Sequence, residues 1–376
     1  MACSCFDVCG GCSYRNMDEQ KYQQLKIEKL HDILLHLKEQ NYRTSEPIFI
    51  ADGKRRRATL NFYHNNKGLS LGFNEKSSHN IVNIDNCDLL TPRINACIPK
   101  IKDLLTELCA LKYTVKQRKN FIVKTISSGD ILISEADNGL DIVLEYDAPV
   151  DINARMIIAE FCQADNDIIR ISHRRNIEDN IEILMQKAVP LIKMGKFDVK
   201  IPAGTFLQAS KDGELALAQL VVKYLKGIKG KIADLFCGVG TFSYYITSET
   251  ANVNILSVDC GADLLDGFAN SINSNKITNI EIRKQNLFKY PLTANETEEF
   301  AAIVFDPPRA GAKEQCRLIA SSDKKPPVIV AVSCNPLSFV RDANILIDGG
   351  YKLKEITLVD QFVYSDHCEL VALFSL

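Results

Sequence analysis

A glycine-containing segment, residues 234–241, has the spacing of a cofactor-binding turn. It overlaps the end of a predicted strand, residues 232–236, and comes directly before a predicted helix. Its glycines permit a tight turn and let a ligand approach the backbone closely. A dinucleotide-binding turn of the G-x-G-x-x-G type would need a third glycine at position 243, which is Ser here. The segment therefore disfavours the pyrophosphate of a dinucleotide as its ligand.

Polar residues at the ends of the following predicted strands extend this site. Asp259 closes the next strand, about twenty residues further on, where a carboxylate can accept hydrogen bonds from both ribose hydroxyls of an adenosyl group. Asn286 and Asp306 follow the third and fourth predicted strands. Ligands of open α/β sheets bind at the carboxyl ends of the strands. The series therefore favours S-adenosylmethionine as the cofactor, and a methyltransferase over a dehydrogenase.

Three further segments are predicted to reach the same edge of the sheet. Residues 306–311 contain two adjacent prolines and form a stiff loop. Cys334 follows an apolar strand, residues 328–332, which places its thiol near the cofactor turn. Residues 360–369 lead into the last predicted strand, which begins at Glu369. A thiolate is a nucleophile and a carboxylate can act as a base, so these residue types suit covalent catalysis.

The N-terminal cysteines have the spacing of a metal centre. Cys3, Cys9 and Cys12 form the pattern C-x5-C-G-G-C, and Cys87 is a distant fourth cysteine. Four thiolates in this arrangement can hold an iron-sulfur cluster. Zinc in a tetrahedral site and free thiols without metal are the alternatives. Cys5 could take the place of Cys3.

The composition is that of a globular chain with more than one domain. It has 376 residues, 46% of them hydrophobic, and no apolar run near the roughly 20 residues of a membrane span. The N-terminus lacks the pattern of a signal peptide, so we expect a cytoplasmic monomer without a membrane partner. A net charge of −2 does not suggest a protein that coats nucleic acid, and DNA is not an expected partner. Contact with RNA would need a local basic patch, such as residues 54–57 or 173–175.

The sequence predicts three segments in an α/β protein. Residues 1–45 combine the cysteines with an amphipathic helix from residue 17 to about residue 40. Residues 46–195 alternate short β-branched runs with turn residues, which is typical of an antiparallel β (α+β) domain, and include a helix near residues 95–111. In residues 196–376 strands and helices alternate, which predicts a parallel, doubly wound sheet: a Rossmann-like class I methyltransferase domain.

The chain resembles the RNA uridine-5-methyltransferase family, which includes ribosomal-RNA and transfer-RNA 5-methyluridine enzymes. The matching segments follow one another through the C-terminal half: residues 204–208, 236–240, 306–311, 333–336 and 360–369. The N-terminal cysteines and residues 72–87 extend the resemblance over most of the chain. Such an ordered set is far less expected by chance than any single motif.

The resemblance implies a covalent mechanism. Carbon 5 of uracil is a poor nucleophile, so the thiolate of Cys334 would first add to carbon 6, and Glu369 would later remove the proton from carbon 5. It implies that S-adenosylmethionine is surrounded by Gln208, Phe236, Gly238, Asp259, Asn286 and Asp306. It also implies a 4Fe-4S cluster on Cys3, Cys9, Cys12 and Cys87. The cluster and the compact layout are similar to the ribosomal-RNA branch, so 23S rRNA is the expected substrate.

Some details differ from the commonest family pattern, and other functions are alternatives. Val363 replaces a frequent proline and Thr241 a frequent asparagine, so local geometry could differ while the reacting groups remain. We expect Cys368 to pack in the core and His367 to orient its loop. The alternatives are a tRNA uridine-5-methyltransferase, a methyltransferase acting on cytosine or an exocyclic amine, and a non-catalytic iron-sulfur protein that binds RNA.

Overall fold

The chain forms two compact units in a computed structural model that describes residues 3–39, 41–117 and 120–376. The first unit comprises Met1–Asn16, Ala51–Ile192 and Ile201–Ser210; the second comprises Met17–Ile50, Lys193–Lys200 and Lys211–Leu376. The predicted segment of residues 1–45 is thus divided between the units, and the predicted boundaries near residues 45 and 195 stay predictions. No helix among the described residues is long and apolar enough to cross a membrane.

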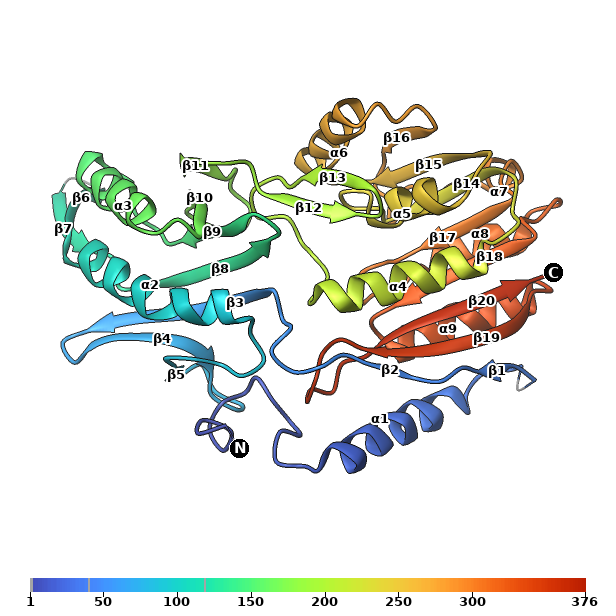
Figure 1. The fold of residues 1–376 in the computed structure, drawn as a ribbon, viewed down its shortest axis with the longest axis horizontal. Helices are drawn as coiled ribbons and strands as arrows, with labels where there is room; N and C mark the ends of the chain where they lie inside the picture. Colours follow the sequence, from blue (N-terminus) through green and yellow to red (C-terminus); the bar gives the residue numbers. More distant parts are fainter. Residues whose placement is uncertain (1–2, 40, 118–119) are drawn as a thin grey trace. The chain divides into compact units, whose positions relative to one another are not determined.

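The first unit is built on a sheet with the strand order β11-β10-β9-β8-β3-β4-β5 (Figure 1). Its strands are β3 (Arg57–Asn65), β4 (Gly68–Asn74), β5 (Ile81–Asn83), β8 (Ser128–Ala136), β9 (Gly139–Glu145), β10 (Ile168–Arg174) and β11 (Glu182–Gln186). Neighbours run antiparallel, except that β9 and β10 are parallel. A parallel pair needs a long crossover connection, which here contains α3 (Ile152–Ala164).

Helix α2 (Pro92–Ala110) forms where the sequence predicts a helix and packs on this sheet. Pro92 stands at its first turn, where the missing N–H costs no hydrogen bond. Its buried apolar side chains recur at helical spacing: Ile94, Ile98, Ile101, Leu105 and Leu108. They share one hydrophobic core with β-strand side chains such as Leu60 and Phe62.

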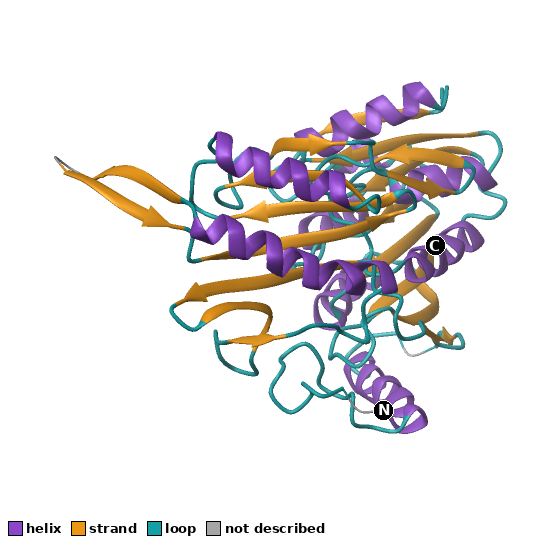
Figure 2. Cartoon of the chain, turned by 60° about the vertical axis from the view of Figure 1, so that its left-hand side comes forward, coloured by secondary structure: helices purple, strands orange, loops and turns teal. Residues whose placement is uncertain are grey.

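Two short ribbons accompany these elements. The hairpin of β6 (Lys112–Gln117) and β7 (Asn120–Thr125) extends away from the sheet of the first unit (Figure 2). Strands β12 (Leu191–Met194) and β13 (Phe197–Lys200) form the second ribbon.

The second unit contains a mixed sheet with the order β1-β19-β20-β18-β17-β14-β15-β16, and β2 also pairs with β19. Its strands are β1 (Arg43–Thr44), β2 (Ile48–Phe49), β14 (Gly230–Leu235), β15 (Val253–Asp259), β16 (Ile280–Lys284), β17 (Ala302–Phe305), β18 (Val328–Ser333), β19 (Lys352–Asp360) and β20 (Glu369–Ser375). Strands β14 to β18 are parallel as predicted. The prediction of an all-parallel sheet is wrong for β20, which runs antiparallel to both β18 and β19. The eight-residue connection from β19 to β20 is too short for a helical crossover.

Helices surround this second sheet. They are α1 (Glu19–Leu34), α4 (Lys211–Tyr224), α5 (Thr241–Glu249), α6 (Ala262–Ser274), α7 (Ala294–Thr297), α8 (Lys313–Ser321) and α9 (Pro336–Asp348). Helix α1, which ends earlier than predicted, contributes Leu30 and Leu34 to the same core as Phe339 and Leu346 of α9. Because β14, β15, β17 and β18 are parallel, the segments that follow them emerge at one edge of the sheet.

Candidate active site

The predicted cofactor turn follows β14 and is held from below by a buried carboxylate. Asp234 is fully buried and accepts hydrogen bonds from Ser243, at 3.0 Å from the backbone N and 2.5 Å from Oγ. Burial raises the pKa of Asp234 to about 7, against the lowering effect of these two bonds. The residue thereby fixes the beginning of α5 beneath the turn.

The backbone of the turn is left-handed at three positions. Phe236, Gly238 and Gly240 have φ angles of 61°, 56° and 88°. A side chain on Gly240 would place its Cβ 2.1 Å from the ring of Phe268, so only glycine fits there. A Cβ on Gly238 would meet nothing within 4 Å, so the space beside Gly238 is open. The turn therefore leaves room for a ligand at its outer side.

Asp259 lies beside this turn at the end of β15. Its Oδ2 accepts a hydrogen bond from the backbone N of Gly238 at 3.0 Å, and its Oδ1 accepts one from Gly261 at 2.9 Å. A carboxylate has about four acceptor positions, so both oxygens can still accept from ribose hydroxyls. The structure thus brings two of the predicted cofactor residues together.

Asn286 follows β16 and caps its own loop. Its Oδ1 accepts hydrogen bonds from the backbone N of Phe288 at 3.0 Å and of Lys289 at 3.2 Å, which leaves its NH2 group as the donor. Phe288 is half exposed, and its ring centroid lies 5.3 Å from that of Phe236. Phe288 was not predicted as a site residue. The only sign of it in the sequence is its position two residues after Asn286.

Cys334 and Glu369 lie at the ends of neighbouring strands, since Cys334 directly follows β18 and Glu369 is the first residue of β20. Ser333 of β18 is paired with Leu370 of β20, and Cys334 and Glu369 are the direct neighbours of this pair in the sequence. The charge of Glu369 contributes to the raised pKa of Cys334, so the two groups are close. The structure therefore joins the two residues predicted to react, from segments that lie 35 positions apart in the sequence.

The protonation of this pair is controlled by burial and by Asp306. Burial raises the pKa of Cys334 to about 11, and the negative charges of Glu369 and Asp306 contribute to the rise. Glu369 is 4% exposed, and burial, followed by the charge of Asp306, raises the pKa of its carboxyl well above the ordinary value. Gln361 opposes this shift by donating a hydrogen bond to Glu369 Oε1 at 3.3 Å. The pKa of each of the two groups therefore lies above its ordinary value.

The proline loop, residues 306–311, is fastened to the beginning and the middle of α9. Asn335 Nδ2 donates to the Arg309 carbonyl at 3.0 Å, and Arg341 Nη2 donates to the Ala310 carbonyl at 2.7 Å. Asp342 Oδ2 accepts from the backbone N of Ala312 at 2.6 Å. The loop that carries Asp306 is therefore fixed relative to α9, which begins two residues after Cys334.

Arg309 connects this loop to the segment that precedes Glu369. Its guanidinium lies 2.7 Å from Nε2 and 3.1 Å from Nδ1 of His367. This contact is compatible with the prediction that His367 orients its loop. Cys368 is 6% exposed and belongs to the hydrophobic core, as its predicted packing role requires.

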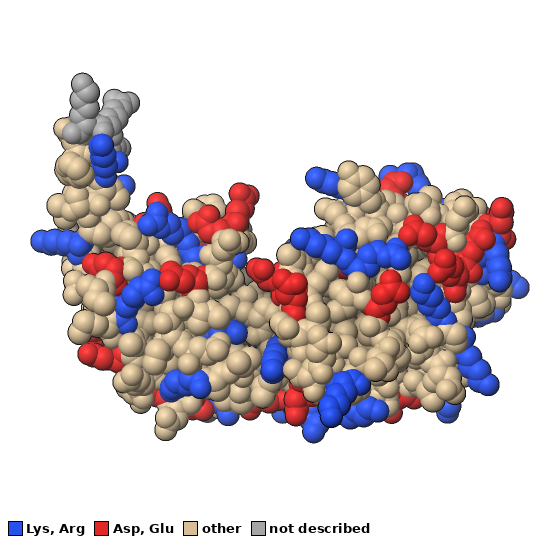
Figure 3. All heavy atoms as spheres, turned by 90° about the horizontal axis from the view of Figure 1, so that it is seen from above, with Lys and Arg blue, Asp and Glu red and all other residues tan. Residues whose placement is uncertain are grey.

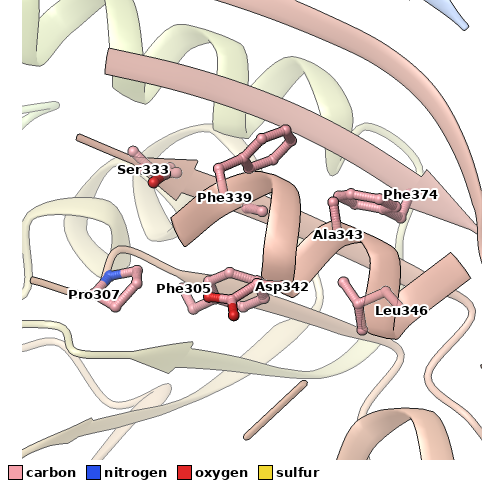
Figure 4. A pocket seen from close by; sticks show the side chains of 10 residues that line it. Phe305, Pro307, Ser333, Phe339, Asp342, Ala343, Leu346 and Phe374 are labelled. Carbon is pink, nitrogen blue, oxygen red and sulfur yellow. The ribbon is translucent and has the colours of Figure 1, made fainter. Parts of the chain in front are cut away.

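A small cavity lies behind this site and is separate from the reacting groups. Figure 4 shows it between the ends of β17 and β18 and helix α9. Its walls are mostly apolar and are formed by Phe305, Pro307, Ala331, Val332, Ser333, Phe339, Asp342, Ala343, Leu346 and Phe374. It reflects the packing of α9, and none of the predicted site residues lines it.

Gln208 belongs to the first unit, unlike the other predicted cofactor residues. Its carbonyl accepts a hydrogen bond from Arg56 Nε at 3.1 Å. Next to it, the guanidinium of Arg57 stacks at 3.7 Å over the ring of Phe206. The part of Gln208 in cofactor binding stays a prediction.

The basic patches expected from the sequence are largely turned inward. Arg56 and His173 are buried, and Arg174 pairs with Glu145 at 2.7 Å. Burial also lowers the pKa of Arg55. These side chains therefore hold the first unit together more than they offer charge to a partner.

The four predicted ligand cysteines all belong to the first unit as partly buried free thiols. The pKa of Cys12 is raised to about 12 by burial and then by the thiols of Cys87 and Cys9, and Cys3 contributes less strongly. The thiol of Cys5 also contributes to the raised pKa of Cys9. In the part of the chain that the structure describes, no three His, Cys, Asp or Glu side chains are arranged to hold a metal ion.

Comparison with known proteins finds relatives among RNA methyltransferases. A model of the tRNA (uracil-5-)-methyltransferase family matches residues 18–375. An uncharacterized RNA methyltransferase of Mesorhizobium japonicum is 34% identical over 99% of this chain and 83% of its own length. The 23S rRNA (uracil(1939)-C(5))-methyltransferase RlmD of Acinetobacter baylyi is 27% identical over 99% of this chain and 79% of its own length.

A solved structure has the same fold. It is the tRNA (uracil-54, C5)-methyltransferase of Pyrococcus abyssi in complex with S-adenosyl-L-homocysteine, with a TM-score of 0.74 and 22% identity. The match covers 97% of this chain and 86% of the other. The predicted α/β methyltransferase fold is thereby confirmed.

Proposed function

The chain belongs to the tRNA (uracil-5-)-methyltransferase family, and we propose that it methylates carbon 5 of a uridine in 23S rRNA, with Cys334 as nucleophile and Glu369 as base. Family membership makes it an S-adenosylmethionine-dependent RNA (uracil-5-)-methyltransferase and confirms the predicted resemblance. The rRNA target, the two catalytic roles and the cluster are the proposal.

The proposed mechanism rests on the closeness of Cys334 and Glu369. The thiolate of Cys334 adds to carbon 6 of the uracil, which forms a carbon–sulfur bond and moves an electron pair to carbon 5 and its carbonyl. The electron pair at carbon 5 would form a bond to the methyl group that S-adenosylmethionine supplies, while the bond from that methyl group to sulfur breaks and S-adenosylhomocysteine leaves. Glu369, as a carboxylate, then takes the proton from the methylated carbon 5, and the electron pair expels Cys334 as carbon 6 and carbon 5 regain their double bond. Because Cys334 directly follows β18 and Glu369 begins the neighbouring strand β20, one uracil ring could meet both.

The turn after β14 fits the cofactor. Phe236, Gly238 and Asp259 offer an aromatic face, an open backbone and ribose acceptors, and Asn286 and Asp306 stand at the same edge. When bound, S-adenosylmethionine supplies the electrophilic methyl group.

The trapping experiment uses RNA that contains 5-fluorouridine, whose carbon 5 carries no removable proton. We expect the wild-type enzyme to form a covalent adduct that survives denaturation, and Cys334→Ala to form none. Cys260→Ala removes an exposed thiol outside the proposed machinery and should still form the adduct. A wild-type enzyme that methylates RNA yet never forms an adduct would refute the covalent mechanism.

The rRNA target rests on the likeness to RlmD, together with the proposed cluster. Mapping 5-methyluridine in the RNA of a strain that lacks this gene tests it. Loss from 23S rRNA is expected. Loss confined to tRNA would instead support a tRNA target like that of the Pyrococcus abyssi enzyme.

The β6–β7 hairpin would bring the first unit into contact with RNA. Lys116 pairs across the ribbon with Phe121, so they share a face with the exposed Val123 and with Lys112. Residues 108–129 contain no Asp or Glu, and Figure 3 shows basic side chains on the projecting hairpin. Lysines bind phosphates and an exposed aromatic ring stacks on an unpaired base.

The hairpin is tested by replacing Lys112, Lys116 and Lys124 together with Gln. The KM for RNA should rise, and the slope of log affinity against log salt should shrink by about 2, since each phosphate contact contributes roughly 0.7. A control with the same change of charge replaces the exposed Lys226, Lys352 and Lys354. Equal effects of both triple variants would mean that the hairpin is no specific RNA contact.

The N-terminal cysteines would hold the 4Fe-4S cluster. Cys3, Cys9, Cys12 and Cys87 are near enough for their charges to affect one another. The backbone N of Gly11 donates to Cys9 Sγ at 3.4 Å, which is the type of bond that tunes cluster sulfurs. Methyl transfer consumes no electron, so we propose a structural or RNA-guiding part for the cluster.

Anaerobic purification followed by iron and sulfide analysis tests the cluster. About four iron atoms and four sulfides per chain are expected. Cys12→Ser should lower both, whereas Cys5→Ser should retain them, because Cys5 is not one of the four proposed ligands. One zinc without sulfide would show that the cluster assignment is wrong.

A further inference from the structure

The loop that carries the proposed base is fastened to the N-terminal helix by buried polar groups. Residues 361–368 connect β19 to β20, and Glu369 is the residue with which β20 begins. Lys26 of α1 and Asp360 at the end of β19 are 3% and 1% exposed and form an ion pair of 3.2 Å. Both residues belong to the second unit.

Lys26 holds the loop through its backbone. Its Nζ donates to the carbonyl of Ser365 at 2.9 Å and also to the carbonyl of His367. The second of these carbonyls is two residues before Glu369. Three oxygens from the start, middle and end of the connection therefore converge on one ammonium group.

Tyr22 adds contacts one helical turn earlier. Its hydroxyl donates to Asp360 and accepts a hydrogen bond from the backbone N of Tyr364 at 2.8 Å. The rings of Tyr22 and Tyr364 lie 4.9 Å apart, and Tyr364 has a φ of 59°, a conformation unfavourable for a residue with a side chain. The contacts of Tyr22 thus hold the loop in a shape that it would not adopt by local preference.

Such a cluster is costly compared with apolar packing. Burying a lysine and an aspartate removes two charges from water, and well-packed apolar residues of the same size are often equally or more stabilising. Two of the three acceptors of Lys26 are backbone carbonyls, so Lys26 fixes the backbone conformation of the loop and not only a side chain. This favours a role in placing the loop.

We propose that Lys26 and Tyr22 are positioning residues that set the loop of residues 361–368, and thereby Glu369, for removal of the proton from carbon 5. The inference rests on the proposed role of Glu369. Cys334 directly follows β18, outside this loop, so its addition to carbon 6 does not depend on α1. The two residues therefore act on the second half of the reaction and leave the first half intact.

The test separates the two halves of one turnover. RNA with tritium on carbon 5 of uridine is mixed with the enzyme and S-adenosylmethionine, and formation of S-adenosylhomocysteine and release of tritium are followed together. In Lys26→Met, tritium release should slow by about 10- to 100-fold, the effect of a small misplacement of a catalytic group. S-adenosylhomocysteine formation in the first turnover should stay near wild type, so the RNA–protein adduct should accumulate on denaturing gels.

Tyr22→Phe keeps the test valid if Lys26→Met does not fold. It retains the ring and removes only the hydroxyl that contacts Asp360 and Tyr364. Lys29→Met is the matched control, because Lys29 contacts Asp366 of the same loop at 2.9 Å but in solvent, with exposed fractions of 49% and 56%. Exposed pairs contribute little, so this variant should behave as wild type.

The outcomes distinguish this inference from the proposed function. If Glu369→Gln accumulates the adduct but folded Lys26→Met and Tyr22→Phe release tritium at the wild-type rate, the positioning role is refuted. It is equally refuted if both steps slow by the same factor and no adduct accumulates. If even wild type and Glu369→Gln form no adduct with any RNA, the proposed mechanism has failed instead.

Discussion

Replacing Glu369 by Gln should trap the enzyme on its RNA and change the pH dependence of the trapping. The variant keeps an acceptor for the hydrogen bond from Gln361 but has no base for the proton of carbon 5. Positioned general bases contribute about 10²- to 10⁴-fold, so turnover should fall by that range. The covalent RNA–protein adduct should then accumulate as the main species.

The structure also gives a magnitude for the first step. With a pKa of about 11, Cys334 is a thiolate in roughly one molecule in a thousand at pH 8, and this fraction rises about tenfold per pH unit. Burial is the largest cause of the raised pKa and the charge of Glu369 is the second. Removing that charge lowers the pKa of Cys334, so adduct formation in Glu369→Gln should be faster than in wild type at the same pH.

The assay measures the rate of adduct formation in a single turnover between pH 7 and pH 9. For wild type we expect an increase toward high pH, and for Glu369→Gln the same curve displaced to lower pH. Glu314→Gln, on the exposed surface of α8, should leave the curve unchanged. Unaltered turnover in Glu369→Gln, or a curve displaced to higher pH, would refute the reasoning.

Three further changes test the framework of the site. Gly240→Ala should lower the free energy of unfolding by about 2–5 kcal/mol, because the new Cβ collides with Phe268 and the backbone is left-handed; a melt within 1 °C of wild type would contradict this. The folded-state pKa of Asp234 is raised to about 7, so the stability that this residue contributes is fully present below about pH 4 and is lost as the pH rises through 7. Asp234→Asn should therefore reduce the change of the free energy of unfolding between about pH 4 and pH 7, measured by urea titrations. An unchanged pH dependence of this free energy would argue against the shift. Asp342→Ala removes the acceptor for the backbone of Ala312 and should raise KM for S-adenosylmethionine and RNA through a loosened residue 306–311 loop, measured by steady-state kinetics; wild-type KM values would show that α9 does not hold the loop.

The edge of the sheet where the site lies could be predicted because strand ends are readable in the sequence. Apolar runs end at Asp259, Asp306 and Cys334, and parallel strands place such ends side by side. The antiparallel direction of β20 was missed, since a short last strand has the same composition in either direction. The correct direction matters for the site, because an antiparallel β20 begins at the edge of the sheet where β18 ends and Cys334 follows.

Contacts that depend on distant packing could not be predicted. Phe288 was unremarkable until its ring was seen beside Phe236, and the basic patches of residues 54–57 and 173–175 proved to be largely internal. Periodicity predicts that α1 has an apolar face, but it gives no reason for a lysine on that face. A buried charge shows its purpose only through its partners, and those of Lys26 are more than 330 positions away in the sequence.

The position of Glu369 illustrates how chain topology serves the chemistry. The parallel strands of this sheet are connected through helices. Strand β20, which begins with Glu369, is instead preceded by a short loop without helix or strand. That loop reaches the reacting edge but has to be fixed from outside. The proline loop supports it through Arg309 and His367, and α1 supports it through Lys26 and Tyr22. A helix close to the N-terminus thus becomes a condition for the last proton transfer of the reaction, although it contributes no group that touches the uridine.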